Sequence, residues 1–127
     1  MKYAVLGTGM VGNTLATKLA ALGHEVRMGA RAADNEKAQS WVSDTGGTAA
    51  HGTYRAVAEW ADRVIFAVSG AHIEAVASAV GNDAVSGKTV IDVTNPLDLS
   101  QGMPPVLVGH LSNTTSAGEA LQAALPE

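Results

Sequence analysis

The sequence contains no cysteine, and aromatic residues make up only 4% of its 127 residues. The absence of cysteine excludes a disulfide framework, thiolate metal ligands and a thiol nucleophile. No apolar run approaches the roughly 20 residues that a transmembrane helix needs, and the first residues lack a signal-peptide pattern. A net charge of −4 argues against a surface for nucleic acid or for anionic membranes. We therefore expect a cytoplasmic globular protein with a small-molecule partner, no nucleic-acid partner and no membrane partner.

Short β-type runs alternate with helical spacing along the whole chain. The predicted strands are residues 3–6, 25–29, 48–51, 64–68 and 89–93. Apolar residues at helical spacing predict helices over 10–22, 54–61, 73–80 and 116–125. Ala38, Trp41 and Val42 mark one face of a further predicted helix, which Gly46-Gly47 ends. Apolar strands that alternate with helices indicate a parallel sheet that is covered on both faces. The predicted fold is α/β, a Rossmann-type doubly wound parallel sheet in three α/β/α layers, with strand order 3-2-1-4-5.

The C-terminal third of the chain has less regular patterning. Residues 100–105 are predicted to form a loop, and Ser116 with Glu119 resembles a capping box at the start of the last helix. The length favours a single domain over residues 1–127. The chain stops after a helix, where this fold would begin another strand, so we expect the cofactor-binding domain of a longer protein.

A glycine-rich loop follows the first predicted strand and precedes the first predicted helix, which is where a dinucleotide-binding loop occurs. Its residues, which match G-x-G-x-x-G, are Gly7, Thr8, Gly9, Met10, Val11 and Gly12. Gly7 would permit the tight turn, Gly9 would let a pyrophosphate approach the backbone, and Gly12 would let helix and strand pack closely. The pyrophosphate would accept hydrogen bonds from amides at the helix start. The alternative is a glycine-rich turn without a ligand.

The residues after the second strand favour NADP over NAD. An NAD site usually carries an acidic residue there, but this chain has Ala30 and Arg31, with Asp34 several residues into the loop. Arg31 could bind a 2′-phosphate through charge-assisted hydrogen bonds. Lys37 could add a second positive charge, or it could be a solvated surface residue.

Ligands in open α/β sheets bind at the carboxyl ends of the strands, which adds three candidates. Val68 ends the fourth predicted strand and Ser69 follows it, and Asn95 follows the fifth. These residues could line the nicotinamide side of the cleft. Ser69 and Asn95 could equally serve as turn or helix-capping residues.

The histidines show no metal-ligand spacing. None of the four, His24, His51, His72 and His110, pairs with another at i+3 or i+4. No metal site is therefore predicted. His72 could lie at the mouth of the cleft as an acid or a cation, or it could begin a surface helix. No serine lies in a G-x-S-x-G elbow, which argues against Ser-His-Asp catalysis.

Several segments together resemble a known family. The glycine loop and Gly29-Ala30-Arg31 are followed by Asn-Pro-Leu-Asp at 95–98 and Gly-Met-Pro-Pro at 102–105. Over nearly its whole length the chain resembles the NADP-binding domain of coenzyme F420-dependent NADP oxidoreductases. The resemblance implies hydride transfer between NADP(H) and a deazaflavin (F420-like), flavin or related acceptor, with Arg31 on the 2′-phosphate. The family often has Ser or Thr where this chain has Ala30, which implies one phosphate hydrogen bond fewer.

Hydride transfer between two rings depends on alignment and exclusion of water more than on acid–base groups, so no catalytic residue is predicted. The family's C-terminal portion, which covers the second substrate and contributes to dimerisation, has no counterpart in these 127 residues. The resemblance allows a homodimer, and it leads us to expect slow turnover by this chain alone. The alternative hypothesis is a dinucleotide-sensing regulatory module that binds without catalysis.

Overall fold

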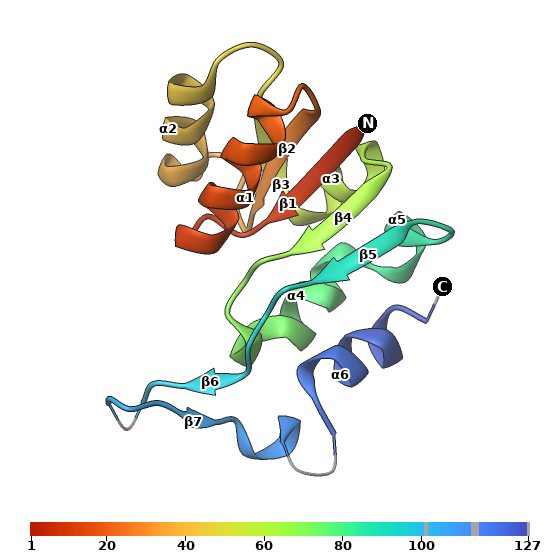
Figure 1. Ribbon diagram of the computed structural model, residues 1–127. Coiled ribbons are helices and arrows are strands. Elements are labelled where there is room, and N and C mark those ends of the chain that lie inside the picture. The colour runs from red at the N-terminus through yellow and green to blue at the C-terminus, as the bar shows by residue number, and fades with distance from the viewer. Residues whose placement is uncertain (101, 113–114, 127) are drawn as a thin grey trace.

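The computed structural model describes residues 1–100, 102–112 and 115–126, and its main feature is a parallel sheet (Figure 1). The strands are β1 (Lys2–Leu6), β2 (Glu25–Ala30), β3 (Ala50–Thr53), β4 (Arg63–Phe66) and β5 (Thr89–Asp92). They are hydrogen-bonded in the order β3-β2-β1-β4-β5, and every adjacent pair is parallel. This confirms the predicted Rossmann-type order.

Helices cover both faces of the sheet. They are α1 (Met10–Ala21), α2 (Glu36–Thr45), α3 (Tyr54–Trp60), α4 (Ile73–Val80), α5 (Asn82–Val85) and α6 (Ala117–Ala124). Figure 1 shows α1 and α2 on one side of the sheet, and α3, α4 and α6 on the other. Because successive strand side chains point to opposite faces, Val5 packs with the α1–α2 side and Leu6 with the α3–α6 side. The three predicted layers are confirmed.

All five strands differ from their predicted bounds: β1, β2 and β5 by one residue at one end, and β3 and β4 by up to two residues. β3 begins at Ala50 rather than at residue 48, because the turn closed by the Ala49 N–H and the Gly46 carbonyl uses the preceding residues. β4 ends at Phe66 rather than at residue 68. The Ala67 N–H still donates to the Leu6 carbonyl at 2.8 Å, but the chain then leaves the sheet toward a 3-10 turn at Gly70–His72 (η1).

The region after β5 contains an arm that the sequence analysis missed. β6 (Leu97–Asp98) and β7 (Val106–Leu107) form an antiparallel hairpin, and the predicted loop at 100–105 connects them, with Gln101 outside the described residues. The hairpin projects away from the sheet at the carboxyl end of β5 (Figure 1). The one-turn α5 and the 3-10 turn Gly109–Leu111 (η2) were also missed. The two-residue strands β6 and β7 are too short to show a sequence period.

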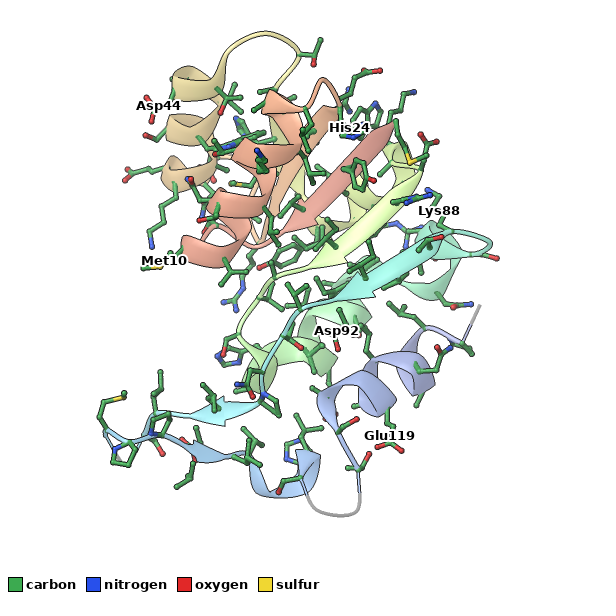
Figure 2. The ribbon with its side chains drawn as sticks, viewed as in Figure 1. Met10, His24, Asp44, Lys88, Asp92 and Glu119 are labelled. Carbon is green, nitrogen blue, oxygen red and sulfur yellow. The ribbon has the colours of Figure 1, made fainter. Side chains whose placement is uncertain are left out.

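The predicted cap of the last helix is present. The Ser116 hydroxyl accepts a hydrogen bond from the Glu119 amide at 3.1 Å, and α6 buries Leu121 and Leu125 against the α3–α4 side of the core. The labelled Glu119 points away from the molecule (Figure 2). Over the described residues, no helix is long and apolar enough to cross a bilayer.

Candidate functional site

The three glycines between β1 and α1 stand in different surroundings. Gly7 has φ +129°, and a β-carbon there would lie 2.3 Å from the Ala67 carbonyl oxygen. A β-carbon on Gly12 would lie 2.3 Å from the Gly7 carbonyl oxygen. A β-carbon on Gly9 would meet no protein atom within 4 Å. Gly7 and Gly12 therefore permit close packing within the protein, whereas Gly9 leaves open space.

The open space lies at the amino end of α1. Gly9 is the N-cap residue of α1, no side chain caps the helix, and its first turn contains no acidic residue. Met10, labelled in Figure 2, is 86% exposed and Val11 is 53% exposed. The unpaired amides and the helix dipole together make this end attractive to an anion.

A cavity of about 240 Å³ begins at this loop and reaches the segment between β4 and α4. It is lined by Gly7, Thr8, Gly9, Arg31, Tyr54, Ala67, Val68, Ser69, His72 and Val76. The parallel topology thus gathers residues that follow β1, β2 and β4 around one space. Five predicted site residues beyond Gly7 are among them: Thr8, Gly9, Arg31, Val68 and Ser69.

A second cavity of about 290 Å³ shares part of this lining and extends it between α3 and α4. Arg31, Tyr54, His72 and Val76 line both cavities. Sequence analysis treated Tyr54 only as a core position of a helix and thereby missed it as a site residue. The predicted third strand ended at residue 51, whereas β3 ends at Thr53, so it is the structure that places Tyr54 at the carboxyl edge of the sheet.

Arg31 is an exposed cation that has no ion-pair or hydrogen-bond partner in the described part of the chain. The neighbouring Arg55 is different, because its guanidinium Nε contacts the Glu59 carboxylate at 2.9 Å and its Nη1 donates to Asp83 Oδ1 and to the Val80 carbonyl, both at 3.1 Å. The hydrogen bond from Arg55 holds the pKa of Asp83 below its usual value. Arg31 is therefore the cation of this cleft that is available to an anionic ligand.

Three other predicted residues lie apart from the Arg31 cavity. Lys37 lines a separate space of about 430 Å³, together with Thr8 and Gly9, on the α1–α2 side. Ala30 is 2% exposed, so its methyl group is buried and has no polar atom to offer. Asn95 is exposed, and its backbone lies so close to Gly70 that a β-carbon there would be 2.4 Å from the Asn95 carbonyl oxygen. The ends of β4 and β5 therefore touch, but Asn95 does not line either of the two cavities around Arg31.

One histidine lines the site, and another contacts α4. His72 is exposed, precedes α4 and lines both cavities. His110 Nε2 lies 2.9 Å from the Glu74 carboxylate, which links η2 to α4. Across residues 1–100, 102–112 and 115–126, no three histidine or acidic side chains gather as metal ligands would.

The comparisons with known proteins agree with this geometry. The family model described as "NADP oxidoreductase coenzyme F420-dependent" matches residues 2–96. A protein from Arthrobacter sp. FB24, assigned as an F420-dependent NADP-reductase, has a crystal structure that is similar over 100% of this chain, with 40% sequence identity and a TM-score of 0.87. This chain spans 59% of the length of the Arthrobacter protein. A comparison with curated protein sequences finds no significant match.

More distant structures share the fold. An imine reductase from Streptomyces aurantiacus is 22% identical, with a TM-score of 0.62 over 76% of this chain and 33% of its own. The pyrroline carboxylate reductase of Plasmodium falciparum, solved with NADP bound, is 17% identical, with a TM-score of 0.58 over 80% of this chain and 36% of its own. At these identities the likeness supports the dinucleotide-binding fold only.

Proposed function

The chain belongs to the family of coenzyme F420-dependent NADP oxidoreductases, and on this premise we propose that it binds NADP(H) for hydride transfer with a deazaflavin or flavin acceptor. The observation that carries the proposal is the unpaired Arg31 guanidinium, which shares one cavity with the open loop at Gly9. A carboxylate at the end of β2 would repel a 2′-phosphate, and this chain has arginine there.

Different residues of the site would bind different parts of the dinucleotide. We assign the pyrophosphate to the amides of the glycine loop and the start of α1, and the 2′-phosphate to Arg31. Val68 and Ser69 would line the nicotinamide side, with Asn95 at the neighbouring strand end. Lys37 would contribute its positive charge from the α1–α2 side of the loop, where it lines a space together with Thr8 and Gly9.

The protein's part in the reaction is binding and alignment. When bound, the nicotinamide and the acceptor ring supply the redox chemistry, in which a hydride passes between them and one proton exchanges with solvent. The glycine loop and Arg31 hold the dinucleotide at two anionic points, which fixes its direction across the strand ends. No acid or base side chain is assigned, because a hydride passes directly between two correctly placed ring carbons.

Arg31→Ala is expected to weaken NADPH binding about 10- to 100-fold and to leave NADH binding nearly unchanged, because only NADPH carries the 2′-phosphate. The wild-type chain should bind NADPH at least about tenfold more tightly than NADH. Calorimetric titration with both nucleotides measures these affinities. Arg63→Ala removes the same charge at the opposite end of the sheet and should not change the preference. Equal wild-type affinities for the two nucleotides would contradict the proposed function.

The second candidate function is a dinucleotide-sensing module, which shares the binding site but not the chemistry. The exposure of Ser69 and Asn95 favours it for this chain, because hydride transfer requires water to be excluded from the rings. The two functions differ in turnover rather than in affinity.

We expect the 127-residue chain to bind NADPH but to turn over below about 1 per second. The strand ends where the nicotinamide would lie are open to solvent, and the chain spans 59% of the Arthrobacter protein. An absorbance assay of NADPH oxidation with F420, flavin and quinone acceptors measures the rate. Rapid turnover by this chain would show that its cleft is sufficient, whereas binding without turnover in every longer form would favour the sensing module.

A further inference from the structure

We infer that the hydroxyl of Tyr54 donates a hydrogen bond to the 2′-phosphate of NADP(H) and so acts with Arg31 as a specificity-determining residue. The inference rests on the proposed function. It follows from where the sheet register places these two side chains, which lie in the same pair of cavities.

The register of β2 and β3 brings the two residues together. Ala30 at the end of β2 is paired with Thr53 at the end of β3. Arg31 directly follows β2 and Tyr54 directly follows β3. Because the two strands are parallel, both residues leave the sheet at the same edge. Both side chains then line the cavity that reaches the glycine loop and the cavity that continues between α3 and α4.

The Tyr54 ring is held by packing in the cavities that Arg31 also lines. Gly29, two residues before Arg31, leaves room for the ring, since a β-carbon at Gly29 would lie 3.4 Å from Tyr54 Cδ1. The ring is half-buried and packs against the α3–α4 side of the core. A ring held in this way presents its hydroxyl with little loss of side-chain entropy on binding.

Two polar side chains next to Arg31 and Tyr54 already have partners within the protein. Arg55 is engaged by Glu59, Asp83 and the Val80 carbonyl. Thr53 caps α3, its hydroxyl oxygen accepting a hydrogen bond from the Ala56 amide at 3.3 Å.

The Tyr54 phenol is in the protonated form that a hydrogen-bond donor requires. Burial raises the pKa of the Tyr54 phenol above its usual value, and the positive charge of Arg31 opposes this only in part. The phenol therefore stays neutral at physiological pH and can donate to an anion. It does not become a phenolate that would compete with the phosphate for Arg31.

Tyr54→Phe tests the inference because it keeps the ring and removes only the hydroxyl. We expect it to weaken binding of adenosine 2′,5′-bisphosphate about tenfold and to leave binding of adenosine 5′-monophosphate unchanged. Calorimetric titration with these two fragments measures the effect without a redox partner. Tyr3→Phe, at the other tyrosine of the chain, is the matched control, because Tyr3 packs on the α1–α2 side of the sheet.

The possible outcomes separate the two proposals. If the wild-type protein prefers the bisphosphate and Tyr54→Phe does not change that preference, the role of Tyr54 is wrong and the proposed function stands. If Tyr54→Phe weakens both fragments equally, the hydroxyl does not distinguish the 2′-phosphate, which also overturns the inference. A wild-type protein that binds both fragments equally would overturn the proposed function and the inference together.

Discussion

Replacement of Gly9 with valine is expected to abolish detectable binding of both NADPH and NADH, a loss of at least about 100-fold, while the protein stays folded. Gly9 has φ −78° and ψ −170°, which any residue can adopt. A β-carbon there would meet no protein atom within 4 Å, so the added side chain enters the space in front of the α1 amides. That space is where we place the pyrophosphate.

Calorimetric titration and a thermal melt together check this prediction. The melting temperature should fall only slightly, since valine in place of glycine at an N-cap costs under about 1 kcal/mol. A Gly9→Ala variant should give an intermediate loss of affinity, because its side chain fills less of the same space. Wild-type affinity in Gly9→Val would mean that the pyrophosphate does not lie over this part of the loop.

The second large effect concerns the fold itself. Gly12→Ala is expected to lower the free energy of unfolding by about 3 kcal/mol or more. The new β-carbon would lie 2.3 Å from the Gly7 carbonyl oxygen and 3.0 Å from the Gly7 carbonyl carbon, so α1 would have to move away from the end of β1. Both contacts are with backbone atoms, which cannot yield as a flexible side chain would.

Urea unfolding of the wild-type protein and the variant measures this loss, which is a large fraction of the 5–15 kcal/mol that is typical of a domain. Gly118→Ala is the matched control. Its β-carbon would be 3.5 Å from Asp92 Oδ2, an ordinary contact, and alanine is the better helix former, so it should be neutral or slightly stabilising. Unchanged stability in Gly12→Ala would mean that α1 and β1 pack less tightly than described.

The layers and the strand order could be predicted from the sequence because they depend on local periodicity. The apolar runs that form β1 and β4 are buried on both faces. A central strand of a parallel sheet is covered by helices on both faces, so nearly all of its residues must be apolar. The strand bounds depended on turns and neighbours, which is why β3 began later and β4 ended earlier than predicted.

The candidate site could be predicted in part. Arg31, Val68 and Ser69 were identified because the carboxyl ends of parallel strands meet at one edge, and the structure brings all three into one cavity. For Lys37 the sequence left open a second positive charge for the phosphate or a surface residue, and the structure shows it lining a separate space with Thr8 and Gly9. Whether these residues bind NADP(H) remains a prediction.

The sequence by itself determined the glycine loop, the arginine after β2 and the family, since each resides in a short stretch of residue types. Only the tertiary structure decided that Tyr54 stands beside Arg31 and that Arg55 is engaged by Glu59 and Asp83. Those relations depend on the register between β2 and β3 and on how α3 packs against α4 and α5. Register and packing are set by contacts between residues distant in sequence, which no local pattern records.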